Sequence, residues 1–290
     1  AIAEFASAVL ITETHPSLDQ FIADDFCGVS YHAQVTSEEG EPMKINLKAT
    51  FANLEEIMAA GGQEVLDKLY SGLVTSAGDG SVVLDVDTSG TLPCSKEELV
   101  GRLACLGRNL VGAPILLALD ALKESNLAVT APKKITISSS GQCMYVATKA
   151  DRVAATYCLR FGDEADVALA KVVLQQMAET SGLNAHYSAT CDIPGAPASN
   201  VGYLSLSVAS MKATKSPDSC LTQLVYFPHY LDYHVKAAKA FVHSRLRGRV
   251  DQLVKVLNRA RPEVVEATKA KSSSSRRHGS GAGAGAGAGA

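Results

Sequence analysis

Three histidines lie near one another around residue 230, and zinc enzymes often hold their metal with three histidines. They are His229, His234 and His243. A helix turns by about 100° per residue, so His234 and His243 would point in opposite directions, and His229 would lie about 140° from His234. Metal ligands on one helix need a spacing of three or four residues. We therefore predict that these histidines hold no metal and that none is catalytic.

Other patterns that could support catalysis are weak. Asp85 and Asp87 form a D-x-D pair in a strand-like segment, and such a pair holds a divalent ion in some transferases. No nucleotide-binding turn accompanies the pair, so we interpret it as the end of a surface strand. The sequence contains no G-x-S-x-G, H-E-x-x-H or P-loop motif. We expect no catalytic residue, no metal and no cofactor.

The cysteines and the apolar runs indicate the compartment. The seven cysteines are odd in number and never spaced as C-x-x-C, unlike a secreted disulfide framework or a zinc ribbon. We interpret them as reduced thiols of a cytoplasmic protein. No apolar run approaches the roughly 18 residues that a membrane span needs. The first 20 residues lack a basic region ahead of their apolar stretch, so we expect a first strand or helix rather than a signal peptide.

The elements that would position any site alternate between strands and helices. Tight turns join several of the strands, which favours antiparallel or mixed sheets. Strand-like segments occupy residues 26–35, 43–51, 81–87, 135–140, 142–149, 152–161, 185–193 and 201–209.

Helical segments lie between these strands. One runs from Phe51 to about Leu69 and is interrupted at Gly61 and Gly62. A second begins at Ser95, where Glu98 three residues later completes a capping box, and it continues in a further piece after Pro114. A third follows Gly162 and is expected to stop at Gly182.

These elements predict an α+β protein built from two similar α/β domains with mostly antiparallel sheets, followed by a long C-terminal helix. We expect the first domain at residues 1–125, the second at 126–217 and the helix at 218–262. Residues 263–290 end in a Gly-Ala repeat that cannot bury apolar surface, so we interpret them as a disordered tail or linker.

The net charge of −3 conceals an uneven distribution. Residues 1–225 carry 15 Lys and Arg against 26 Asp and Glu, whereas residues 226–261 carry 8 against 2. An acidic body with one basic element indicates a directed electrostatic contact rather than general nucleic-acid binding.

The expected C-terminal helix has two distinct faces. Its apolar side chains fall within about 100° of one another, which predicts a surface that packs on something. These are Leu231, Val235, Val242, Leu246, Val250, Leu253 and Leu257. A helix that only needed solubility would alternate its charges, whereas this one is almost purely basic, which favours a protein contact. Pro228 predicts a kink or a helix start.

Four segments of the chain are similar to subunit 2 of the actin-related protein 2/3 complex. They are YLDYHVKAAKAFVHSRLR, LVKVLNRARPE, MYVATKADRV and DDFCGVSYH, and their order and spacing agree with that family over residues 21–262. The chain departs from it at Pro228 and Gly248, which interrupt or weaken a helix expected to be continuous.

The resemblance implies a non-enzymatic scaffold of the cytoplasmic actin cytoskeleton. In that family the long helix packs against the helix of subunit 4, to which we assign the apolar face, and the pair faces the side of the mother actin filament at a branch. The filament-facing positions implied here are Phe227, Arg245, Arg247, Arg249, Lys255, Arg259 and Arg261.

Two other functions are compatible with the residue pattern. A stand-alone α/β enzyme or small-molecule binder would use the D-x-D pair or a cysteine, and it would be a soluble monomer. A basic helix could also bind anionic lipid, although folding would then consume the apolar face needed for insertion.

Overall fold

A computed structural model describes residues 1–14, 20–25, 27–36, 42–124, 129–137, 141–149, 151–180, 184–209 and 215–260. The chain divides into two units, Ala1–His243 and Ser244–Ala290. Both sheets and most helices belong to the first unit, and the second contains the last part of the C-terminal helix.

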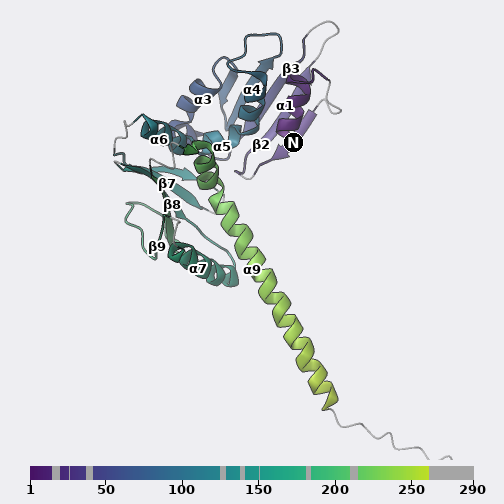
Figure 1. Ribbon diagram of the computed structural model, residues 1–290, viewed down its shortest axis with the longest axis vertical. Coiled ribbons are helices and arrows are strands. Elements are labelled where there is room, and N and C mark those ends of the chain that lie inside the picture. Colours follow the sequence, from purple (N-terminus) through teal and green to yellow (C-terminus); the bar gives the residue numbers. More distant parts are fainter. Residues whose placement is uncertain are drawn as a thin grey trace, which may run out of the picture. The chain divides into compact units, whose positions relative to one another are not determined.

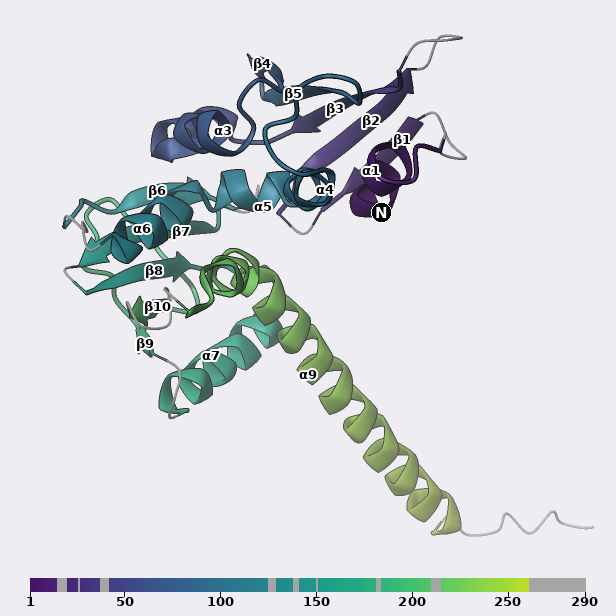
Figure 2. The same ribbon diagram turned by 45° about the horizontal axis from the view of Figure 1, so that its top comes forward.

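The first sheet has five antiparallel strands in the order β1-β2-β3-β5-β4 (β2 and β3 are labelled in Figure 1 and all five strands in Figure 2). Alternate side chains along β2, β3 and β5 are buried, as Tyr31, Ala33 and Val35 show on β2, while most of their neighbours are partly or fully exposed. The strands are β1 (Gln20–Asp24), β2 (Ser30–Thr36), β3 (Lys44–Thr50), β4 (Val74–Gly78) and β5 (Ser81–Asp87).

Among the described residues, seven helical pieces precede the second sheet in the chain, and the last of them, α6 (Ala113–Lys123), packs on that second sheet. The capping box is confirmed, because the Ser95 hydroxyl oxygen accepts from the Glu98 amide at 3.2 Å. The interruption at Gly61 is also confirmed: Gly61 has φ 122°, which favours glycine, within a short π-helix. The pieces are α1 (Ile2–Leu10), α2 (Leu54–Ile57), η1 (Met58–Gly62), α3 (Gln63–Leu69), α4 (Lys96–Ala104), α5 (Leu106–Val111) and α6 (Ala113–Lys123).

The second sheet repeats the topology of the first, with the order β6-β7-β8-β10-β9, again fully antiparallel. In each sheet three sequential strands pair in turn, helices follow, and the fifth strand inserts beside the third. α7 (Glu164–Glu179) lies beside β9 (Figures 1 and 2). The strands are β6 (Lys133–Thr136), β7 (Cys143–Lys149), β8 (Arg152–Cys158), β9 (Ala185–Ser188) and β10 (Tyr203–Ala209).

One continuous apolar core joins the two sheets with α6 and the start of α9 (Pro217–Arg259). The α+β class with two similar antiparallel halves and a long C-terminal helix is therefore confirmed. The domain boundaries at residues 125, 217 and 262 remain predictions.

The structure adds two strands that the sequence interpretation did not include. β1 was not expected, and β4 lies between the helix expected to end at about Leu69 and the strand expected at residues 81–87. The actual turn is confined to Asp79 and Gly80, which both have positive φ as two-residue hairpin loops require. The N-terminal segment, left open between strand and helix, is the helix α1. Gly182 and the tail after Ala260 lie outside the described residues.

Candidate functional site on the C-terminal helix

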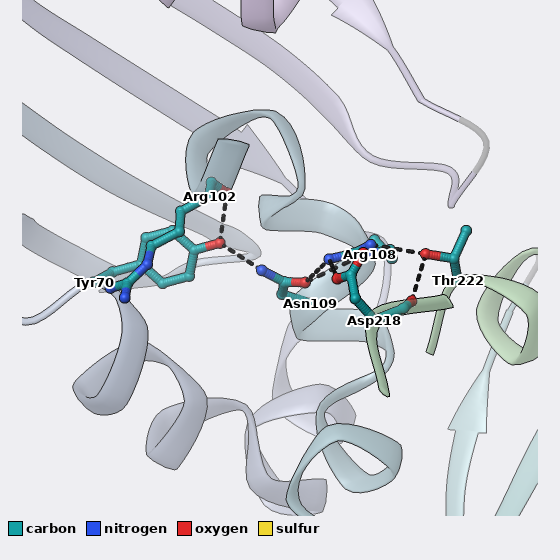
Figure 3. Close-up of polar contacts among 6 residues, drawn as sticks. All are labelled: Tyr70, Arg102, Arg108, Asn109, Asp218 and Thr222. Carbon is teal, nitrogen blue, oxygen red and sulfur yellow. Dashed lines mark hydrogen bonds and ion pairs between the residues drawn. The ribbon is translucent and has the colours of Figure 1, made fainter. Parts of the chain in front are cut away.

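The first turn of α9 is fixed by a buried arginine from α5. Arg108 is only 8% exposed, and its guanidinium donates to Asp218 Oδ1 at 2.7 Å and to Thr222 Oγ1 at 2.8 Å (Figure 3). Asp218 lies in the first helical turn, where a carboxylate also stabilises the helix dipole. The buried guanidinium of Arg108 therefore connects the first turn of α9 to α5 through these two hydrogen bonds.

The same arginine extends the network into the first sheet's helices. Its Nε and Nη2 donate to Asn109 Oδ1, and Asn109 Nδ2 donates to the Tyr70 hydroxyl oxygen at 3.1 Å. Tyr70 donates in turn to the Arg102 carbonyl at 2.7 Å (Figure 3). The buried side chains of Tyr70, Arg108 and Asn109 therefore all have partners within this network, which is the condition for such a network to be stabilising.

Pro228 does not end the helix. The proline has no N–H, so the carbonyl of Leu224, four residues earlier, loses its helical donor. The Tyr157 hydroxyl on β8 donates to this carbonyl at 2.7 Å. The Tyr157 ring also packs on Phe227, with ring centroids 4.8 Å apart. The second sheet thus replaces the missing hydrogen bond, and α9 runs unbroken from Pro217 to Arg259.

Further along, α9 is held by the N-terminus of α7. Lys239 Nζ lies 3.1 Å from Asp163 Oδ1 and 2.9 Å from Asp166 Oδ1. Asp163 is also the N-cap of α7 and accepts from the amides of Ala165 and Asp166. The Lys239 ammonium and these amides lower the pKa of Asp163, and the two carboxylates raise the pKa of Lys239.

The apolar face of α9 divides into two parts. Leu231 and Val235 are fully buried in the chain's own core, so they cannot contact another subunit, and this part of the interface assignment is corrected. The remaining five members of the face are between 43% and 58% exposed. They are Val242, Leu246, Val250, Leu253 and Leu257, which we call the exposed seam.

The basic residues of α9 also fall into two groups, those with an ion-pair partner within the chain and those without one among the described residues. Lys236 pairs with Asp232, and Lys239 pairs with α7, so the chain itself satisfies both. Within the described residues no carboxylate lies within ion-pair distance of Arg247, Arg249, Lys255 or Arg259. Arg245 is exposed, and Arg261 lies outside the described residues.

Phe227 does not lie with these cations. It is 5% exposed and packs on Tyr157, so it forms part of the core and cannot act as a surface anchor without leaving it. Sequence reasoning missed instead the exposed aromatic side chains of α9. Tyr230, Tyr233 and Phe241 are 54%, 68% and 60% exposed, and His234 stacks on Tyr230 with centroids 4.1 Å apart. The helical period could have identified these aromatic residues, because it places them on other sides of the helix than the buried Leu231 and Val235.

Comparisons with known proteins identify the family of the chain. The family described as "Arp2/3 complex, 34 kD subunit p34-Arc" matches residues 45–264. The chain belongs to this family. It is similar to Actin-related protein 2/3 complex subunit 2 of Dictyostelium discoideum, at 27% identity over 84% of this chain and 86% of the relative. It is likewise similar to the protein of that name from Schizosaccharomyces pombe, at 26% identity over 87% of this chain and 89% of the relative.

Membership in the p34-Arc family makes the chain a structural, non-catalytic subunit. The residues first considered for chemistry have other roles. Asp85 accepts from Asn46, and Asp87 accepts from Ser89 and pairs with Lys44. The Ser89 hydrogen bonds in particular lower the pKa of Asp87. Both carboxylates therefore already bind neighbouring side chains of the same chain.

The described histidines and cysteines of the p34-Arc chain form no metal-binding group. Among the described residues no group of three or more His, Cys, Asp or Glu side chains is arranged to hold a metal ion. All seven cysteines lie among the described residues, none of them forms a disulfide, and four of them are buried. Burial raises the pKa of Cys158 to about 12, which keeps that thiol protonated. In the same part of the chain, no helix combines the length and the hydropathy that crossing a bilayer requires.

Proposed function

We propose that the chain is the core subunit of an Arp2/3 complex that pairs with subunit 4 through the exposed seam and contacts the side of the mother actin filament through its basic residues. This places it in the actin networks of the cytoplasm. The observation that carries the proposal is the exposed seam itself: Leu246, Val250, Leu253 and Leu257 are each more than half exposed on one helix. Contiguous apolar surface of this kind marks an interface in soluble proteins.

The pairing is tested by co-expression with subunit 4. We expect Leu246→Glu with Leu253→Glu to abolish retention of subunit 4 on the tagged chain, because two carboxylates would be buried without partners. The matched control is Ile22→Glu with Val172→Glu, which changes two apolar side chains that are 74% and 63% exposed elsewhere. Undiminished retention by the first variant would contradict the assignment of the seam.

The filament contact is assigned to Arg245, Arg247, Arg249, Lys255 and Arg259, with Arg261 retained as a proposal from the sequence. Actin filaments are acidic, and Arg247, Arg249, Lys255 and Arg259, which have no carboxylate of the described residues within ion-pair distance, would gain from an acidic partner. Their contribution should fall steeply with salt, because exposed charges are screened over about 8–10 Å at physiological ionic strength. Phe227 is left out because it is buried.

The test of this contact reverses two cations within the assembled complex. We expect Lys255→Glu with Arg259→Glu to weaken cosedimentation with filaments at least tenfold at low salt, with a smaller difference at high salt. Lys48→Glu with Lys171→Glu makes the same charge change at two exposed lysines of the first unit and serves as control. Equal cosedimentation of all three complexes would show that the basic residues of α9 do not face the filament.

A further inference from the structure

Three of the seven cysteines meet on one face of the second sheet. Cys143 on β7 and Cys158 on β8 are direct partners in the antiparallel ladder. Both are at most 1% exposed, and with Tyr145 and Tyr203 they form a small apolar cluster that is separate from the main core. Cys191, from the loop between β9 and β10, packs against this cluster. Thiols from three distant parts of the sequence therefore lie together.

The loop that carries Cys191 is held on the cluster by hydrogen bonds to one of its carbonyls. The Pro197 carbonyl accepts from the Cys158 thiol at 3.2 Å and from the Tyr203 hydroxyl at 2.8 Å. Ile193 of the same loop also packs against the cluster. The loop therefore covers Cys158 and holds its own cysteine against the same group of side chains.

Cys191 differs from the two buried thiols in its access to solvent. It is half-buried, and the Ile193 amide donates to its sulfur at 3.5 Å. A thiolate accepts such a hydrogen bond more strongly than a neutral thiol does, because the acceptor is charged. Thiolate character and exposure decide which cysteine an oxidant modifies. Of the three thiols, Cys191 is therefore the one that a dissolved oxidant reaches first.

We propose that Cys191 is a site of reversible oxidation by hydrogen peroxide and that it forms a disulfide with Cys158. The partner is Cys158 rather than Cys143 because the Cys158 thiol already bonds the loop that carries Cys191. The disulfide would join this loop covalently to β8. This site lies outside α9, so it goes beyond the proposed function and does not depend on it.

The oxidation takes two steps that balance. In the first, the Cys191 thiolate attacks one oxygen of hydrogen peroxide, the O–O bond breaks, and the departing hydroxide takes up a proton to become water, which leaves a sulfenic acid. In the second, the Cys158 sulfur attacks the Cys191 sulfur, the S–S bond forms, the S–O bond breaks, and the hydroxyl leaves with the proton of the Cys158 thiol as a second water. The two sulfurs together lose two electrons, which the peroxide gains. A dithiol reductant reverses the reaction by exchange.

The environment of Cys158 makes the second step slow. Burial above all raises the pKa of Cys158 to about 12, and the neighbouring Cys143 and Cys191 thiols raise it further in the same direction. Little attacking thiolate is therefore present at neutral pH. The sulfenic acid of Cys191 should consequently persist long enough to be trapped with dimedone, which reacts with sulfenic acids.

Mapping of the disulfide by mass spectrometry tests the proposal. The full chain is treated with hydrogen peroxide, its remaining thiols are alkylated, and trypsin then places the three cysteines of the cluster in different peptides. These peptides are residues 135–149, 153–160 and 172–212. We expect the second and third to become linked at least tenfold above the untreated chain, and a dithiol to remove the link. Cys94→Ser, which removes a half-buried cysteine elsewhere, is the control and should form the same link.

Two variants separate the steps. Cys158→Ser should leave Cys191 as the sulfenic acid, measured as at least fivefold more dimedone adduct than in the wild-type chain. Because replacement of a buried residue can destabilise the fold, Cys191→Ser, at a half-buried loop position, is the second variant and should abolish the link. The proposal is overturned if peroxide links Cys158 to Cys143 instead, or if Cys191 enters no disulfide in the wild-type chain.

Discussion

The Leu224 carbonyl shows how a hydrogen-bond donor that is missing from a helix is replaced by a residue far away in sequence. Pro228 removes the donor that this carbonyl would have within the helix, and Tyr157 supplies one from β8. A buried carbonyl without a donor costs about 1–3 kcal/mol, so the tyrosine is the reason that a proline is tolerated in mid-helix. Burial raises the pKa of Tyr157, which keeps its hydroxyl a donor.

A double-mutant cycle tests this compensation. We expect Tyr157→Phe to lower the free energy of unfolding by about 1–3 kcal/mol, because the Leu224 carbonyl is then left without a donor. In the Pro228→Ala background the helix supplies that donor itself, so the same substitution should cost less. Urea denaturation of the four proteins measures the difference. Equal costs in both backgrounds would show that the two residues act independently.

At the scale of elements, α9 is a single helix in two environments. Leu231 and Leu253 are 22 residues apart, which places them within about 40° of each other around the helix, yet the first is fully buried and the second is 58% exposed. Helix geometry makes these side chains equivalent, and only the sheets and helices packed on the first half make them different.

These two leucines form a matched pair for stability measurements. We expect Leu231→Ala to lower the free energy of unfolding by about 2–5 kcal/mol, as removal of a buried leucine side chain usually does. Leu253→Ala should change it by less than about 0.5 kcal/mol in the isolated chain, as exposed positions do. Chemical denaturation of both variants is the measurement, and similar costs would mean that Leu253 is also covered within the chain.

The ion pairs between Lys239 and α7 predict a pH dependence. The lowered pKa of Asp163 means that its contribution is present above the unfolded value of roughly 4 and is lost as the pH falls through the folded value. The raised pKa of Lys239 means that its contribution is present below roughly 10 and is lost as the pH rises through its folded value.

Lys239→Met is the variant that measures this contribution. We expect the wild-type chain to have the higher thermal midpoint by a constant margin between roughly pH 5 and pH 9, and the margin should shrink below about pH 4 and above about pH 10.5. Lys236→Met, whose partner lies on the same helix, is the control for loss of a lysine from α9. A margin that does not change with pH would exclude the ion pairs as its source.

At the scale of the whole molecule, folding and assembly use different parts of the chain. All described residues from Ala240 to Ala260 are exposed, and the second unit begins at Ser244. The core of the first unit is complete without them. The stability of the first unit and its ability to join a complex should therefore be separable.

A shortened chain tests this separation. We expect a chain that ends at His243 to unfold within about 2 °C of the full chain, because it loses no buried side chain. The same chain should fail to retain subunit 4, because four of the five seam residues are removed. Scanning calorimetry and co-expression measure the two properties. A large fall in the thermal midpoint would show that residues after 243 stabilise the first unit.

The sequence alone determined the elements whose cause is local. The strand alternation, the Ser95 capping box, the break at Gly61, the excess of basic charge on α9 and the face of its apolar residues all follow from period and residue type. The tertiary structure alone decided what covers each face. Period places Leu231 and Leu253 on one side of a helix, but it carries no information on which neighbours pack there, so Phe227 and the first two residues of the apolar face, Leu231 and Val235, proved to be core. Likewise, Pro228 signals a break by its missing N–H, and the tertiary structure supplies a replacement donor from Tyr157, 71 residues earlier in the sequence.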